Sequence, residues 1–81
     1  MFKVGKVIHY YDKIAIAIVE LDNNLAVNDQ IRFMIDGKEL FRQTVDSIQV
    51  EHEKKDSAVR GDVIGLKTIK KVVDGTVIFR V

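Results

Sequence analysis

His9 and His52 are the two histidines of the sequence and the side chains best suited to bind a metal ion. Each could offer an imidazole nitrogen, and Glu51 or Glu53 could add a carboxylate oxygen. The sequence contains no cysteine and few donors beyond these. We therefore favour the interpretation that both histidines are solvated at the ends of strands, and we expect no metal and no cofactor.

Catalysis by a nucleophile has weaker support than metal binding. Ser47 and Ser57 lie outside any nucleophile elbow or Ser-His-Asp pattern, and the sequence offers no thiol. Neither Gly5-Lys6-Val7 nor Gly37-Lys38-Glu39 continues as a phosphate-binding loop of the G-x-x-x-x-G-K-S/T type. We therefore predict that the protein is not an enzyme and that it binds no nucleotide.

The run Tyr10-Tyr11-Asp12-Lys13 places two aromatic rings beside a lysine at the end of a predicted strand. Tyrosine rings can stack on nucleobases while a lysine holds a phosphate. The alternative, which we favour for at least one tyrosine, is that the ring closes one end of the core. Tyr10, Tyr11 and Lys13 are therefore candidate residues for binding RNA or a protein partner.

Four more basic side chains form the best predicted cationic cluster: Lys67, Lys70, Lys71 and Arg80, the last on a neighbouring predicted strand. Lysines in such positions commonly keep a strand edge solvated and discourage the addition of another strand. As a binding site, the cluster would supply contacts to phosphates.

The charge of the chain is nearly balanced, with thirteen Lys and Arg against twelve Asp and Glu, which gives no strong field for nucleic acid or membrane. The 81 residues predict a single domain over 1–81 with a modest core. No basic-then-apolar leader begins the sequence, and the longest apolar run, 14–19, is too short to span a bilayer. These features predict a cytoplasmic protein with no membrane partner.

Runs of β-forming residues separated by turn signals predict an all-β barrel with six strands. Asp36-Gly37 is a strong signal for a tight hairpin turn. The fourth run changes parity near Asp46-Ser47, which predicts a bulge or bend at that point. The stretch 51–57 is charged and non-periodic, and we predict a loop with room for one helical turn. The predicted strands cover residues 2–10, 13–21, 29–35, 39–52, 62–67 and 76–81.

Two of the predicted strands have informative side-chain patterns. In the first, Phe2, Val4, Ile8 and Tyr10 share one parity, which suits a half-buried strand. In the second, isoleucines alternate with alanines and a valine over 14–19, so both faces are apolar. We interpret this second run as a central strand with its small residues on the crowded side of the barrel.

The stretch Ala58-Val59-Arg60-Gly61-Asp62-Val63-Ile64-Gly65-Leu66 reads as a turn that leads directly into a buried strand. Gly61 can adopt a positive φ in the turn. Gly65 marks a place in the strand where another chain segment is expected to come close. Asn28 is expected to take the left-handed conformation in a similar phrase earlier in the chain.

Together with this stretch, the phrases Gly5-Lys6-Val7, Lys13-Ile14-Ala15, Leu25-Ala26-Val27-Asn28-Asp29 and Val73-Asp74-Gly75-Thr76-Val77-Ile78 resemble the second domain of translational GTPases such as elongation factor Tu. The resemblance covers essentially the whole chain and implies a six-stranded closed Greek-key barrel. A similar barrel ends the collagenase-like peptidases, where His9-Tyr10-Tyr11-Asp12-Lys13-Ile14 would fit equally well.

The elongation-factor resemblance implies a standalone, non-catalytic module that binds RNA or the ribosome. The acidic residue of that factor's tRNA pocket falls near Gln49 here, which implies that the pocket is not retained. The alternative is a protein-interaction module that docks on an enzyme or a GTPase through its Tyr10–Lys13 end. The nearly balanced charge favours a protein partner, whereas the lysines and tyrosines favour RNA, which is our first hypothesis.

Overall fold

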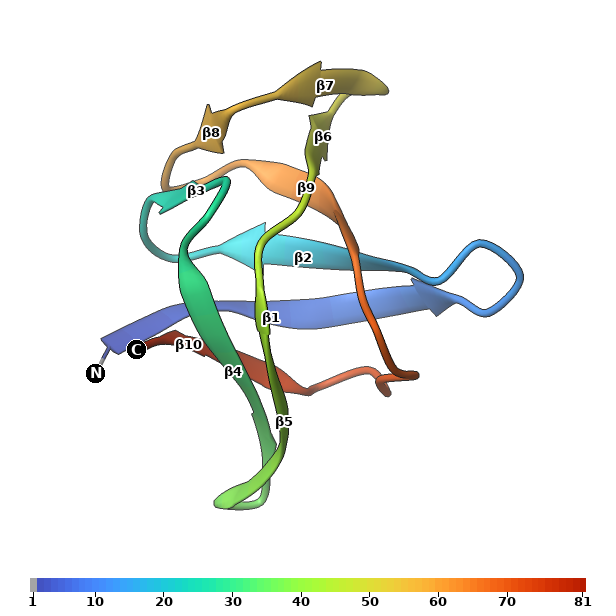
Figure 1. The fold of residues 1–81 in the computed structure, drawn as a ribbon, viewed down its shortest axis with the longest axis vertical. Helices are drawn as coiled ribbons and strands as arrows, with labels where there is room; N and C mark the ends of the chain where they lie inside the picture. Colours follow the sequence, from blue (N-terminus) through green and yellow to red (C-terminus); the bar gives the residue numbers. More distant parts are fainter. Residues whose placement is uncertain (1) are drawn as a thin grey trace.

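A computed structural model describes residues 2–81 and contains ten strands and no helix within that range (Figure 1). None of the elements described over 2–81 is a helix that could cross a membrane. The strands are β1 Phe2–Tyr11, β2 Ile16–Leu21, β3 Leu25–Ala26, β4 Gln30–Ile35, β5 Lys38–Thr44, β6 Ile48–Val50, β7 Glu53–Lys55, β8 Ser57–Ala58, β9 Val63–Lys67 and β10 Val77–Arg80.

Eight strands form one strongly curved antiparallel sheet in the order β5-β4-β10-β1-β2-β9-β6-β7, and β3 pairs with β8 in a second, short sheet. The all-β prediction is therefore confirmed. The hydrogen-bonded ladder ends at β5 on one side and at β7 on the other, so a closed six-stranded barrel is not confirmed. The chain ends lie side by side, because Phe2 at the start of β1 pairs with Arg80 near the end of β10 (Figure 1).

The core lies on the concave side of the sheet and is built mainly from aliphatic side chains of β1, β2, β4, β9 and β10. In β2 the small residues point inward, as predicted: Ala17 and Val19 are fully buried. The isoleucines of the same run point outward, and Ile14 just before the strand is 59% exposed. The second strand is thus buried on one face only.

The predicted parity of the first strand holds for Val4 and Tyr10 but is wrong for Phe2 and Ile8, because two β-bulges interrupt the strand. The register shifts between Lys3 and Gly5 against β10, and between Val7 and His9 against β2. Each bulge moves the following side chains to the opposite face. As a result Val4 and Val7 are buried, whereas Phe2 and Ile8, predicted to face the core, are exposed.

Several predicted turns are confirmed by positive φ angles. Asp36 and Gly37 have φ of 50° and 78° in the tight turn between β4 and β5. Gly61 at 92° and Asn28 at 80° also adopt positive φ. The loop predicted over 51–57 is wrong, however: β6 and β7 form a tight hairpin through Glu51 and His52, whose φ angles are 51° and 66°.

The long fourth strand is broken where its parity changes. Residues 45–47 lie between β5 and β6, which confirms the bend predicted near Asp46-Ser47. This bend carries the chain from one side of the sheet to the other, because β5 pairs with β4 whereas β6 pairs with β9. The Gln43 side chain bridges the same gap by donating to the Lys67 carbonyl at 2.8 Å and accepting from the Ile69 amide at 2.9 Å.

Candidate functional site

The outer face of β1, β2, β9 and β6 carries an apolar strip. In the middle of this face His9, Ile18, Gly65 and Gln49 follow one another across the four strands in register. A parallel row places Tyr11 opposite Ile16, which in turn pairs with Lys67. The strip therefore has isoleucines on β2 and a residue without a side chain at its centre.

Gly65 creates a hollow in this strip. A Cβ atom at this position would lie 3.4 Å from Ile16 Cγ2 and 3.7 Å from Gln49 Cβ, which is ordinary van der Waals contact. No segment passes close over Gly65, so the close approach predicted there is wrong. The close approach occurs at Gly5 instead, where a Cβ would press against the backbone carbonyl oxygen of Glu20.

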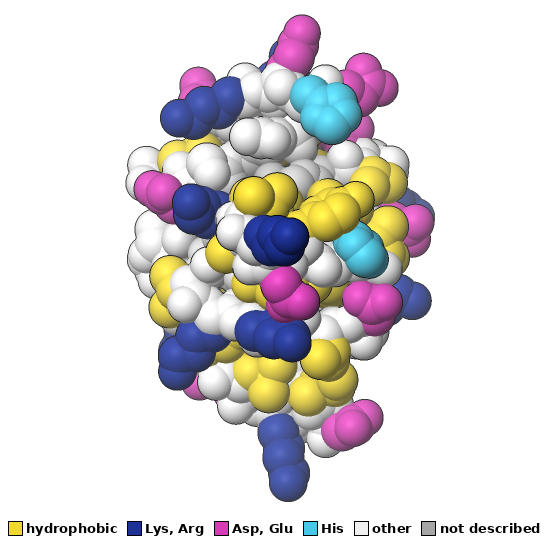
Figure 2. Space-filling model, turned by 90° about the vertical axis from the view of Figure 1, so that its right-hand side faces the viewer, with side chains coloured by type: hydrophobic (Ala, Val, Ile, Leu, Met, Phe, Trp, Pro, Cys, Tyr) yellow, Lys and Arg dark blue, Asp and Glu magenta, His cyan; other side chains and the backbone are white. Residues whose placement is uncertain are grey.

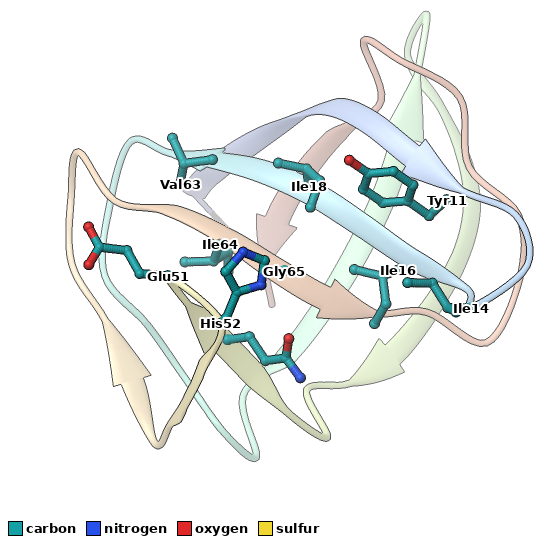
Figure 3. Close-up of a pocket in the computed structure, with 10 residues that line it drawn as sticks. Tyr11, Ile14, Ile16, Ile18, Glu51, His52, Val63, Ile64 and Gly65 are labelled. Atoms are coloured by element: carbon teal, nitrogen blue, oxygen red, sulfur yellow. The ribbon is translucent and has the colours of Figure 1, made fainter.

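The hollow over Gly65, called the Gly65 hollow below, is a cavity of about 210 Å³ (Figure 3). Most of its wall is aliphatic or aromatic. The space-filling view shows hydrophobic side chains gathered between the two histidines of the chain (Figure 2). The lining residues are Tyr11, Ile14, Ile16, Ile18, Gln49, Glu51, His52, Val63, Ile64 and Gly65.

The β6–β7 turn holds the rim of the hollow in an unfavourable backbone conformation. Glu51 and His52 both have positive φ, where a two-residue turn ordinarily favours Asn-Gly. A residue with a Cβ loses roughly 1–2 kcal/mol in this conformation. In Figure 3 the His52 ring lies beside Gly65, whereas the Glu51 carboxylate points away from the hollow. Backbone strain of this kind concentrates at functional sites.

The two histidines do not assemble a metal site with their neighbours. Within residues 2–81, no group of three or more His, Cys, Asp and Glu side chains is placed to hold an ion. The ring of His9 contacts Tyr11 edge-on, with centroids 4.4 Å apart and planes at 74°. Because His9 and Tyr11 are two residues apart on β1, this contact steadies the tyrosine at the edge of the hollow.

The two tyrosines divide between core and surface, in agreement with the interpretation that at least one closes the core. Tyr10 packs against the core cluster, and its partner across the ladder is the buried Ala17. Tyr11 is 49% exposed and lines the hollow. Lys13 is exposed in the turn that follows, next to the lining residue Ile14.

The predicted basic cluster is divided: Lys67, Lys70 and Lys71 are exposed at the end of β9 and in the segment that follows it, whereas Arg80 lies elsewhere. Lys71 forms an ion pair of 3.5 Å with Asp12, just beyond the end of β1. Arg80 lies beside the start of β1, with its guanidinium over the Phe2 ring and a 2.7 Å hydrogen bond to the Asn24 carbonyl. The ten residues of β1 separate these points by about 30 Å.

Two exposed lysines lie beside the hollow. Lys13 and Lys67 are exposed, and neither forms an ion pair with any residue in the described range. Asp12, the acidic residue beside Lys13, is already paired with Lys71. Two acidic residues are also near: Glu51 lines the hollow, and Glu20 stands opposite the lining residue Val63 in the β2–β9 register.

Sequence reasoning missed the hollow, although one signal pointed to it. The run 14–19 is apolar on both faces, which indicates either a strand buried on both sides or a strand with a binding face. The second interpretation, a strand with a binding face, is the better one, because the missing side chain at Gly65 leaves space beside the isoleucines. That juxtaposition depends on the pairing of β2 with β9.

The chain is similar to part of one known protein in sequence and to two solved structures in fold. No protein-family profile matches the chain. It is 27% identical over 73 residues to an uncharacterized protease of Methanocaldococcus jannaschii, an alignment that covers 90% of this chain and 18% of that protein. The chain thus spans less than a fifth of that relative's length.

Two solved structures share the fold. Both are of the C-terminal domain of a candidate U32 peptidase from Geobacillus thermoleovorans, one of them a selenomethionine variant. The variant has a TM-score of 0.90 at 21% identity and covers 98% of this chain and 99% of that one. The other has a TM-score of 0.88 at 21% identity, with 96% and 90% covered.

These relatives support one of the two resemblances stated from the sequence. The barrel at the end of collagenase-like peptidases is supported, and the elongation-factor barrel is not. The fold is therefore that of a peptidase C-terminal domain.

Proposed function

We propose that this chain is a non-catalytic accessory domain that docks on another protein through the Gly65 hollow. The observation that carries the proposal is the exposed apolar strip itself. Ile14 and Val63 are 59% and 47% exposed, and both line a concave site next to Tyr11. Contiguous exposed apolar surface of this kind marks interaction sites on proteins.

The size of the relative suggests what the domain docks on. The match to the Methanocaldococcus protease covers 18% of that protein, so most of that protein lies outside the matching segment. The fold neighbours are C-terminal domains of a candidate peptidase. We infer that the partner is a protein of the peptidase class, and that the chain supplies no catalytic group to it. This develops the protein-docking alternative drawn from the sequence.

The RNA-binding alternative has less support from the arrangement of charges. A nucleic-acid site needs several basic side chains along one track. Arg80 lies at the far end of β1 from Lys71, and Lys71 already pairs with Asp12. Lys13, Lys67 and Lys70 are exposed and form no ion pair within residues 2–81. Three lysines are a small set of contacts for a phosphate backbone.

The proposal is tested by capture from a lysate of the source cells with a matched pair of variants. Ile14→Glu places a charge in the strip, whereas Ile69→Glu changes an isoleucine that is similarly exposed, at 67%, and does not line the hollow. We expect wild type and Ile69→Glu to retain the same protein partner, and Ile14→Glu to lose it.

Ribonuclease treatment of the lysate separates the two candidate functions. Capture that survives the nuclease supports protein docking. Capture that disappears with the nuclease, or that is equal for Ile14→Glu and Ile69→Glu, contradicts it.

A further inference from the structure

The dimensions of the Gly65 hollow suit a single aromatic side chain. Its volume is about 210 Å³, and an apolar cavity of roughly 150 Å³ is enough to hold benzene. Ile16, Ile18 and Val63 supply aliphatic walls, and the exposed Tyr11 ring stands at one edge (Figure 3). An aromatic anchor that fills such a pocket is the usual centre of a protein interface.

The charged residues around the hollow indicate which residue of a partner would be favourable next to the aromatic side chain. Lys67 lies two residues from Gly65 on the same face of β9, and Lys13 precedes the lining residue Ile14. Neither lysine is paired within residues 2–81. Glu51, the one acidic residue of the lining, turns its carboxylate away (Figure 3). In the strand register the two lysines lie toward the Lys67 end of β9, whereas Glu51 and Glu20 lie toward its Val63 end. A complementary partner therefore brings its negative charge to the Lys67 end.

We propose that the Gly65 hollow binds an aromatic side chain of a protein segment that carries an acidic residue next to it. The aromatic ring fills the hollow over Gly65, and the neighbouring carboxylate meets Lys67, with Lys13 as a second cation. This inference rests on the proposed docking function, and it specifies the chemistry of the partner.

The test is a titration of the labelled chain, followed by amide chemical shifts, with three five-residue peptides capped at both ends. The first has the sequence Gly-Asp-Phe-Asp-Gly, the second replaces Phe with Ala, and the third replaces both Asp with Lys. We expect the first peptide to shift the amides of Ile18, Val63 and Gly65. The other two are expected to bind at least tenfold more weakly.

Variants of the chain test whether the first peptide binds in the Gly65 hollow. Gly65→Val fills the hollow from its floor and is expected to weaken the first peptide at least tenfold. Tyr11→Ala, which removes an exposed wall, provides a second variant if Gly65→Val does not fold. Lys67→Gln is expected to weaken the same peptide several-fold and to reduce its salt dependence. Lys38→Gln, an exposed lysine of the β4–β5 hairpin, serves as the matched control and is expected to change nothing.

Several results would overturn the proposal. These are equal binding of the three peptides, shifts that map away from the hollow, displacement of the peptide by a uridine oligonucleotide at physiological salt, or self-association of the chain through the same residues. Failure of the peptides while lysate capture still depends on Ile14 would reject the acidic-aromatic partner and leave the docking function standing. Failure of both experiments would reject the docking function as well.

Discussion

At the scale of single residues, the close approach of another chain segment that the sequence predicted at Gly65 occurs at Gly5 instead. Gly5 lies in the bulged part of β1, where a Cβ would press against the Glu20 carbonyl oxygen and lie 3.0 Å from Val19 Cγ1. Gly65 lies on the open outer face, where a Cβ meets only ordinary contacts. The sequence suggested a crowded position at Gly65, because this glycine stands within a run of β-forming residues.

Alanine substitutions distinguish these roles. Gly5→Ala is expected to lower the free energy of unfolding by about 1–3 kcal/mol, because β2 backbone atoms must move. Gly65→Ala is expected to change it by no more than about 0.5 kcal/mol, as for other surface substitutions. Denaturant titrations of both variants check this prediction, and a larger loss for Gly65→Ala would contradict the structure.

Glu39 gives the stability a defined pH dependence. Hydrogen bonds from Arg42 and Arg32 to its carboxylate lower the pKa of Glu39. A group whose pKa is lower in the folded state stabilises the fold above its unfolded pKa, and this contribution is lost as the pH falls through the folded pKa.

Glu39→Gln is therefore expected to destabilise the protein at neutral pH and to lose this effect in acid. Urea unfolding of wild type and variant at a series of pH values from about 7 to 2 provides the measurement. A stability difference that stays constant over this range would show that the two arginines do not favour the ionised carboxylate.

At the scale of elements, the β6–β7 hairpin combines a strained turn with the rim of the hollow. Glu51 and His52 adopt the positive φ angles that Asn-Gly would adopt with less strain. His52 also lines the hollow. We therefore expect this turn to be less stable than an Asn-Gly turn, and we expect its His52 side chain to contribute to binding.

Replacing the turn tests that expectation. The double variant Glu51→Asn with His52→Gly is expected to raise the free energy of unfolding by about 0.5–2 kcal/mol and to weaken partner capture. Glu51→Asn alone retains His52, so it is expected to stabilise less and to keep capture at the wild-type level. Loss of stability in the double variant would contradict the assignment of strain.

At the scale of the whole molecule, the bent connection from β5 to β6 and the Gln43 side chain join β5, at one end of the open ladder, to the part of the sheet formed by β9 and β6. Gln43 is 8% exposed, and its side chain donates a hydrogen bond to the Lys67 carbonyl and accepts one from the Ile69 amide. It thereby ties β5 to the segment that follows β9. Because β9 also carries Gly65, this bridge fixes one wall of the hollow relative to the rest of the sheet.

Gln43→Ala is expected to cost about 1–3 kcal/mol of stability, because it removes the partners of two backbone groups. It is also expected to speed amide hydrogen exchange at Ile69. Gln49→Ala, an exposed glutamine on β6, serves as the control and is expected to have little effect on either measurement. Equal protection of Ile69 in wild type and Gln43→Ala would contradict the bridging role.

What the sequence determined by itself is the part of the fold governed by neighbouring residues. The tight turn at Asp36-Gly37, the positive φ of Gly61 and the strand character of 16–21 follow from local backbone preferences, and all are present in the structure. The break near Asp46-Ser47 was also visible, because a change of side-chain parity is a local signal.

The tertiary structure decided everything that depends on which strands pair and in which register. The bulges of β1 reversed the predicted faces of Phe2 and Ile8. The distance between the two ends of β1 separated Arg80 from Lys71. The Gly65 hollow exists only because β9 lies between the isoleucines of β2 and Gln49 of β6. Such pairings arise from many weak contacts between residues far apart in the chain, and no short stretch of sequence contains them.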